Sequence, residues 1–250
     1  MKDSIYKSRK YVWVSAGILV MVWAIVARWL DNEIIVPSPV SAIYSLLDIV
    51  KGKNFLKLLM ATLSRSCTSF LISVVLALVL GVLSGLIRWA YHMMIPVVSV
   101  LKSVPTMAVI ILGLIWLNSE SAPILIGIIL VFPVLYESVV EGMLNVDQKL
   151  LQMAELYSVS TKNIVLGIYI PTVGTYLSTV IGAALGLTLK AVIAGEVLGQ
   201  PKYSIGGSLQ MEKMYLNTSG VFAWIIIVVV LSILLERIIK LFFIKVNSWK

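Results

Sequence analysis

The stretch ATLSRSCTSFLISVVLALVLGVLSGLI, residues 61–87, decides the class of fold. It is longer than the roughly 20 residues that a helix needs to cross the hydrocarbon core of a bilayer, and Arg65 is its only charged residue. Gly81 and Gly85 lie four positions apart, which brings them to one helix face and permits close contact with a neighbouring helix. The stretch therefore predicts a membrane-spanning helix that packs tightly against another.

The rest of the chain repeats this pattern. The sequence is 60% hydrophobic and 13% charged, whereas soluble domains are nearer half apolar and about a quarter charged. Pro105 falls inside one apolar run, where a missing backbone donor predicts a kink or break. Besides residues 61–87, the predicted spans are residues 11–30, 93–117, 122–142, 172–198 and 221–243. We expect an all-α, polytopic membrane protein with about six transmembrane helices, forming one transmembrane domain over residues 1–250.

The net charge of +8 predicts an orientation and argues against nucleic acid as a partner, because the basic residues gather at the ends of spans. On one side lie Lys2, Lys7, Arg9, Lys10, Arg88, Lys149, Lys162, Arg237, Lys240, Lys245 and Lys250. The opposite loops hold only Lys51, Lys53, Lys57, Lys202 and Lys213. Since cytoplasmic loops carry the excess of Lys and Arg, both termini and residues 145–171 are predicted to be cytoplasmic. Cys67 is the single cysteine, which excludes an internal disulfide and a multi-cysteine metal site.

Residues 145–171 form an amphipathic segment between two spans. Asn145, with Gln148 three positions later, predicts a helix start, and Leu150, Leu151, Ala154 and Tyr157 share one helix face. The first helix is expected to end near Ser158, and a second, capped by Ser160, is expected to end at Pro171. This helix-turn-helix elbow lies flat on the membrane surface or docks into a groove of another protein.

The elbow resembles the cytoplasmic EAA loop of bacterial ABC-importer permeases, whose pattern is E-A-A-x3-G-x9-I-x-L-P. This chain has Gln152, Met153, Ala154, Ser158, Ile168, Ile170 and Pro171 at the corresponding positions. Seven further short motifs occur in the order found in permeases of the nitrate, sulfonate and taurine type, the binding-protein-dependent transport system inner membrane components. They are residues 62–65, 102–108, 132–133, 194–197, 204–206, 215–216 and 222–224. The resemblance covers roughly residues 37–237.

This resemblance implies a type I importer of the bacterial cytoplasmic membrane. The implied partners are a second permease copy, two cytoplasmic ATP-binding-cassette ATPases and an extracytoplasmic substrate-binding protein. The elbow would be the coupling helix, with the contact at or near Gln152, Ala154, Glu155, Tyr157 and Ser158. ATP and Mg²⁺ would bind the partner ATPase, since this chain has no G-x-x-x-x-G-K-[ST] motif. We therefore expect no cofactor and no enzyme activity in the chain itself.

Charged residues within spans suggest a transport path, because such residues are costly in a bilayer and often functional. The charged candidates are Lys190, Lys102 and Glu196. Pro105 is a further candidate, because broken spans often line transport paths. The alternative for each lysine is snorkelling or a hydrogen bond to a backbone carbonyl, and for Glu196 a place at the membrane interface. Two lysines favour an anionic solute, such as nitrate, a sulfonate, taurine or a thiamine-precursor-like molecule.

The remaining charged residues near the spans are assigned structural roles. Arg65 is expected to be a solvated or lipid-facing anchor, and Glu137 and Glu141 to mark a solvated helix end. A secondary transporter, which would need inverted repeats and a coupling-ion site, stays as an alternative. So does a membrane scaffold, which would not stimulate an ATPase. A membrane-embedded enzyme would require a catalytic constellation that the sequence does not show.

Overall fold

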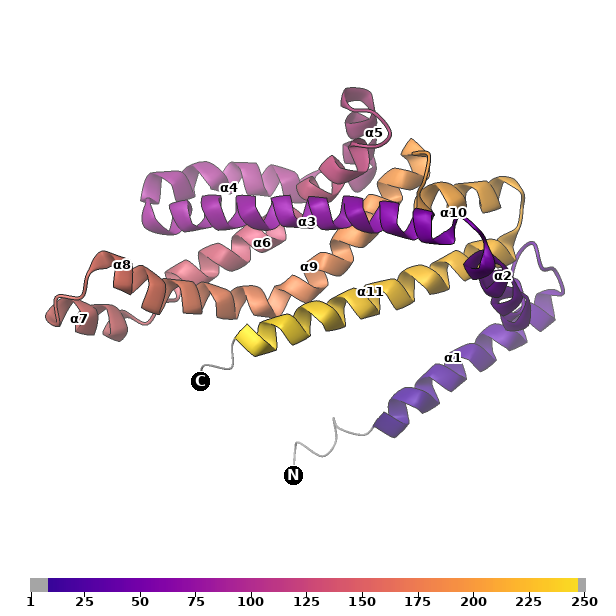
Figure 1. Ribbon diagram of the computed structural model, residues 1–250, viewed down its shortest axis with the longest axis horizontal. Helices are drawn as coiled ribbons and strands as arrows, with labels where there is room; N and C mark the ends of the chain where they lie inside the picture. Colours follow the sequence, from indigo (N-terminus) through magenta and orange to yellow (C-terminus); the bar gives the residue numbers. More distant parts are fainter. Residues whose placement is uncertain (1–8, 247–250) are drawn as a thin grey trace. The chain divides into compact units, whose positions relative to one another are not determined.

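The computed structural model describes residues 9–246, and within that range every regular element is a helix (Figure 1). The first half contains α1 (Arg9–Leu30), α2 (Pro39–Lys51), α3 (Phe55–Leu86), α4 (Arg88–Ser103), α5 (Thr106–Trp116) and α6 (Ala122–Leu144). The second half contains α7 (Gln148–Leu156), α8 (Thr161–Ile164), the π-helix η2 (Val165–Tyr169), α9 (Ile170–Gly199), α10 (Ile205–Met214) and α11 (Thr218–Val246). The predicted all-α fold is confirmed. Lys2, Lys7 and Lys250, which enter the predicted orientation, lie outside the described residues.

The long apolar helices agree with a polytopic membrane protein. Among the described residues, five helices are long and apolar enough to cross a bilayer: α1, α3, α6, the unbroken run Thr161–Gly199, and α11. A sixth span results if α4 and α5, which meet at a 99° bend, are counted as one. Pro105 lies at this bend, as its position in the sequence predicts. Because proline cannot donate a backbone hydrogen bond and restricts the preceding residue, Val104 adopts an extended conformation with ψ 129°.

The chain divides into two compact units, one of residues 1–56 and 208–229 and the other of residues 57–207 and 230–250. In the first unit, Trp23 Nε1 donates a hydrogen bond to the carbonyl of Pro37 at 3.0 Å, and its ring stacks on Phe222 with centroids 5.3 Å apart. Ser38 caps α2 by accepting a hydrogen bond from the backbone of Ser41. These contacts tie α1 and α2 to the start of α11 within this unit.

The second unit is built around α6, which packs along α9 (Figure 1). Buried apolar residues lie on several faces of α6, among them Val131, Phe132 and Val140. The predicted close contact at Gly81 and Gly85 is confirmed. A methyl group at Gly81 would lie 2.6 Å from the Val139 side chain, and one at Gly85 would lie 2.5 Å from Met143. The two glycines therefore let α3 approach α6 closely.

Candidate functional site

The first helix of the elbow is capped two residues later than predicted. Asp147, not Asn145, caps α7: its extended backbone lets the carboxylate accept a hydrogen bond from the Lys149 amide at 2.9 Å. Asn145 instead ends α6, and its side-chain amide donates to the carbonyl of Glu141 at 2.9 Å. The prediction of Asn145 as the cap is wrong because Asn and Asp are both good helix caps. The sequence does not show which of Asn145 and Asp147 has the extended backbone that a cap requires.

The turn after α7 explains why glycine suits this position in the EAA pattern. Ser158 has φ 52°, in the left-handed region that glycine adopts most easily. Its amide donates to the carbonyl of Glu155, and the amide of Val159 donates to that of Ala154, both at 2.9 Å. These hydrogen bonds close the helix end where the sequence predicts it. The turn is thus retained with serine in place of glycine.

The second arm of the elbow is continuous with α9, contrary to prediction. The sequence predicts that Pro171 ends this arm, yet Pro171 is the second residue of α9 and the backbone is helical on both sides of it. The π-helix η2 directly precedes it and joins α8 to α9. Thr161–Gly199 is therefore one helical run, and the second arm of the elbow is continuous with α9.

An apolar stripe on α7 and its turn is exposed. Leu150, Met153, Leu156 and Tyr157 are between 47% and 82% exposed. Of the predicted coupling residues, Gln152, Glu155, Tyr157 and Ser158 are exposed, whereas Ala154 is only 8% exposed. Ala154 thus faces the protein, because the elbow buries one side of α7 and presents the other.

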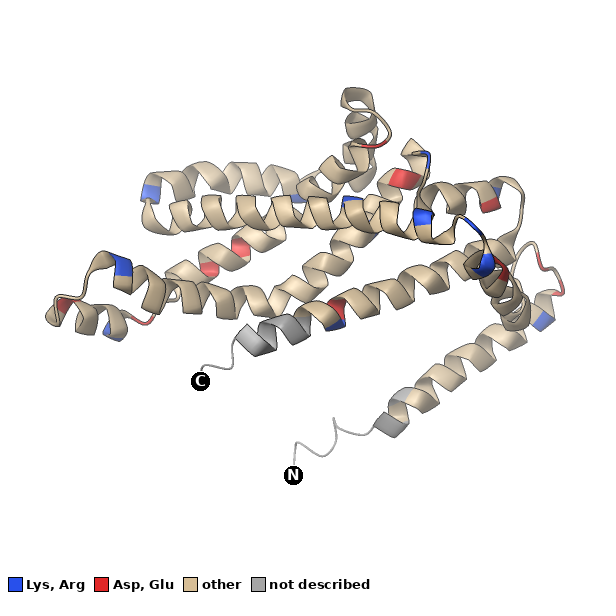
Figure 2. Ribbon diagram, viewed as in Figure 1, with Lys and Arg blue, Asp and Glu red and all other residues tan. Residues whose placement is uncertain are grey.

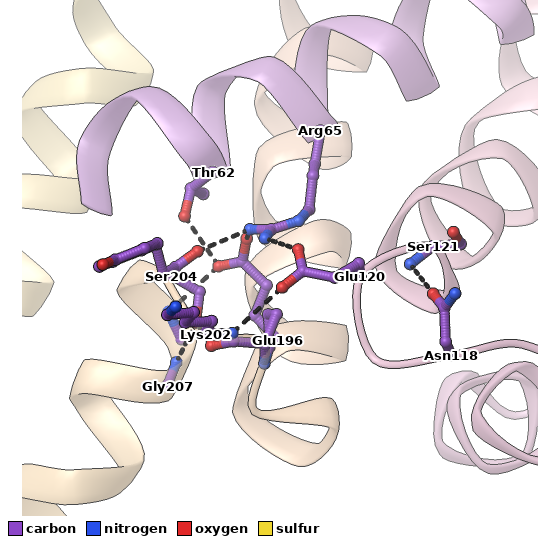
Figure 3. Close-up of polar contacts among 12 residues, drawn as sticks. Thr62, Arg65, Asn118, Glu120, Ser121, Glu196, Lys202, Ser204 and Gly207 are labelled. Atoms are coloured by element: carbon purple, nitrogen blue, oxygen red, sulfur yellow. Dashed lines mark hydrogen bonds and ion pairs between the residues drawn. The ribbon is translucent and has the colours of Figure 1, made fainter. Parts of the chain in front are cut away.

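At the opposite end of α9, Glu196 lies at the centre of a polar cluster (Figure 3). Its side chain is fully buried, and its carboxylate accepts hydrogen bonds from Arg65 Nη1 at 2.7 Å and from Thr62 Oγ1 at 2.9 Å. The backbone amide of Gly206 supplies a third at 3.1 Å. Thr62 and Arg65 lie on α3, Glu196 on α9 and Gly206 on α10. The cluster therefore links α3, the end of α9 and the start of α10.

The prediction that Arg65 is a solvated or lipid-facing anchor is wrong. Arg65 is only 7% exposed. Its guanidinium also donates a hydrogen bond to the carbonyl of Tyr203 at 3.0 Å and forms an ion pair with Glu120. The sequence does contain a signal for this burial. Small polar residues recur on α3 three or four positions apart and are buried: Thr62, Ser66, Ser69 and Ser73. A polar stripe of this kind predicts a face turned toward protein.

Glu120 forms the exposed edge of the cluster. It lies in the loop between α5 and α6, and its side chain is 54% exposed. The hydrogen bond from Arg65, helped by one from the backbone amide of Lys202 at 3.1 Å, holds the pKa of Glu120 below its ordinary value. Partial burial opposes this shift without cancelling it. Glu120 is therefore charged at neutral pH and links the α5–α6 loop to α3.

The remaining path candidates are not brought together. Lys102 forms an ion pair with Glu137, with Nζ 2.7 and 3.0 Å from the two carboxylate oxygens, so Glu137 does not mark a merely solvated helix end. Pro105 begins α5 at the bend. Lys190 is exposed on α9, and its ammonium has no hydrogen bond or ion pair within residues 9–246. Figure 2 shows that charged residues are sparse along the long helices.

Comparison with known proteins decides the family. The family model for "binding-protein-dependent transport system inner membrane component" matches residues 73–247. The chain belongs to this family. The recognition made from the elbow and the flanking motifs is therefore confirmed, and with it the assignment to a multi-pass inner-membrane transport component. The family is one of transport components and not of enzymes.

Relatives in this family align along most of the chain. The putative aliphatic sulfonates transport permease protein SsuC of Bacillus subtilis is 22% identical over 97% of this chain and 90% of its own length. The taurine transport system permease protein TauC of Escherichia coli is 22% identical over 94% of this chain and 87% of its own. The nitrate import permease protein NrtB of Synechocystis sp. is 24% identical over 74% of this chain and 70% of its own.

Proposed function

We propose that the chain is the permease subunit of an ATP-driven importer and that its elbow docks into a partner ATPase. The observation that carries this proposal is the exposed stripe of Leu150, Met153, Leu156 and Tyr157. An amphipathic helix with such a stripe suits a groove on another protein. Gln152, Glu155 and Ser158, all exposed, supply a polar rim around it. ATP and Mg²⁺ would be bound by that ATPase.

Transmission would run along α9. About 40 Å of helix axis separate Pro171 from Glu196 at 1.5 Å per residue, and the backbone is helical throughout. A shift of the elbow, produced when the ATPases close, would therefore move the end that carries Glu196. The fully buried Glu196 suits transmission of this movement better than contact with the solute. Alternating access would follow from such movements in two permease copies.

The path would follow the exposed face of α9. Thr175, Thr179, Ala183, Leu187 and Lys190 recur three or four positions apart and are exposed. A lysine in contact with lipid would be unfavourable, so this face suits a water-filled path between two copies of the chain. Both termini and the elbow would be cytoplasmic, and the binding protein would deliver solute at the end that holds Glu120.

The proposed solute carries an anionic group. The relatives are named for sulfonates, taurine and nitrate, and Lys190 offers a cation without a partner among the described residues. Lys102 is a weaker candidate for binding the anionic group, because its ammonium already forms an ion pair with Glu137. Lys190 is therefore the residue to which we assign the anionic group.

Affinity purification of the tagged chain in mild detergent, followed by mass spectrometry, tests this proposal. We expect a P-loop ATPase at about one copy per permease, and cross-linking that yields a permease dimer. Repeated recovery of the folded chain alone would contradict the proposal and favour the autonomous transporter or the scaffold.

A further inference from the structure

An apolar groove lies between the last turns of α3, the end of α6 and the joint of η2 with α9. It has a volume of about 200 Å³, and its walls include Leu78 and Leu86 on α3 and Tyr169 on η2. None of its described lining residues is charged, and the Tyr169 hydroxyl is their only polar side-chain group. An apolar cavity of about 150 Å³ stays dry and binds apolar molecules. The groove therefore suits an apolar occupant better than water or an ionic solute.

The rim of the groove lies on the side of α9 away from the proposed path. Leu86 and Ile170, which line the groove, are both exposed. Ile170 and Thr179 are nine positions apart, which is two and a half turns of α-helix, so they lie on opposite faces of α9. Thr179 belongs to the exposed face that we assign to the path. The groove is therefore expected to face lipid.

Two cations lie at the end of the groove nearest the elbow. Arg88 follows Leu86 by two residues, and Lys162 precedes Val165 by about one helical turn. Both are exposed, and neither side chain has a hydrogen bond or ion pair within the described part of the chain. Figure 2 shows basic residues on α8 and at the start of α4. Trp89 beside them is exposed, and tryptophan favours the level of the lipid headgroups.

We propose that the groove binds an acyl chain of an anionic phospholipid of the cytoplasmic leaflet, with the phosphate held by Arg88 and Lys162. Basic pockets between helices on the cytoplasmic side bind headgroups of this charge. From Leu86 to Leu78 the groove extends about 12 Å along α3 at 1.5 Å per residue. This is most of the roughly 15 Å that one leaflet contributes to a 30 Å hydrocarbon core. The inference rests on the proposed function, which places the elbow in the cytoplasm.

The bound lipid would contact the joint between the elbow and α9. Val165 and Tyr169 belong to η2, whereas Val173 and Leu177 belong to α9, and all four line the groove. Short π-helices are frequent at functional sites. The acyl chain would therefore pack against both sides of this joint and against α3.

Photo-cross-linking of the full chain in nanodiscs locates the lipid directly. Phosphatidylglycerol and phosphatidylcholine, each with a diazirine in one acyl chain, are compared as equal trace fractions in a phosphatidylcholine bilayer. Labelled peptides are identified by mass spectrometry after irradiation. Gly174→Leu fills the groove, because Gly174 lines it and a side chain there meets open space. Gly17→Leu on α1, where a side chain also meets open space, is the matched control.

We expect phosphatidylglycerol to label the groove, residues 78–86 and 165–177, about tenfold more than phosphatidylcholine does, because each basic residue near the membrane surface attracts an anionic lipid. Gly174→Leu should remove this labelling, since the acyl chain no longer fits. Gly17→Leu should retain it.

The headgroup contact is tested with a pair of double variants. Arg88→Gln with Lys162→Gln should abolish the preference for phosphatidylglycerol, because no cation is left at the end of the groove. Lys51→Gln with Lys53→Gln removes the same charge from exposed positions elsewhere and should leave the preference unchanged. Equal loss in both double variants would reduce the preference to a general attraction and would overturn the assignment to Arg88 and Lys162.

Equal labelling of the groove by the two lipids would overturn the inference. Labelling confined to other segments would also overturn it, since the groove would then be covered by a second copy of the chain or by another protein. Should the Arg88 and Lys162 double variant fail to fold, the comparison of the two lipids and Gly174→Leu still decides. ATPase co-purification is scored separately, so that a permease with its ATPase but without this labelling would contradict the lipid site alone.

Discussion

Arg65 binds the buried carboxylate of Glu196 through Nη1, 2.7 Å from Oε1, and joins α3 to the far end of α9. The same guanidinium reaches Glu120 in the α5–α6 loop. One arginine therefore connects a fully buried acid to a half-exposed one. This arrangement joins α3, the end of α9 and the α5–α6 loop through a single guanidinium.

Breaking this pair should destabilise the protein strongly. Arg65→Leu removes the counterion of the fully buried Glu196 side chain, and breaking a buried ion pair in this way typically costs about 3–5 kcal/mol. Thermal unfolding in detergent should show a large loss of stability for this variant and for Glu196→Leu. The double variant should lose less than the sum of the two, because neither charge is then left alone. Additive losses would contradict a direct pair.

Acid should weaken the contact between Arg65 and Glu120. The folded pKa of Glu120 lies below its ordinary value of 4.5, so its contribution to stability is present above that pH and is lost as pH falls through the folded pKa. Unfolding temperatures of the native protein and of Glu120→Gln should differ at pH 7. The difference in unfolding temperature should shrink as pH falls below 4.5. A difference that grows would contradict a lowered pKa of Glu120 in the folded protein.

Ser158→Gly should stabilise the elbow. The left-handed backbone at φ 52° costs a residue with a side chain about 1–2 kcal/mol, and glycine recovers part of it, roughly 0.5–1 kcal/mol after its own entropy cost. Ser158→Val should destabilise. Thermal unfolding measures both changes, and a stabilising valine would mean that the turn is not left-handed.

Lys190→Ala should impair uptake more than assembly, because the lysine is exposed and makes no described contact that holds the fold. Uptake of a radiolabelled solute and recovery of the intact complex are measured together, with Lys190→Arg as the control that keeps the charge. Normal uptake by the alanine variant would remove Lys190 from the path.

The helices were predictable from composition because the bilayer demands long apolar runs, and the break at Pro105 follows from proline chemistry alone. Pairing between distant residues was not predictable in the same way. Arg65 and Glu196 are separated by 131 positions, and no local rule brings them together. Pro171 misled because proline both ends helices and begins them. Here α8 and the π-helix η2 run into α9 without a break, a feature that periodicity does not reveal.

The most direct test of the central claim compares Met153→Asp with Gln148→Asp in the transporter reconstituted with its ATPase and binding protein. Met153 lies in the exposed apolar stripe, whereas Gln148 lies on another face of the same helix, so both variants add the same charge to α7. We predict that Met153→Asp abolishes ATP-driven uptake and that Gln148→Asp retains most of it, with both proteins folded. Unchanged coupled uptake in Met153→Asp would contradict the assignment of the elbow as the coupling element.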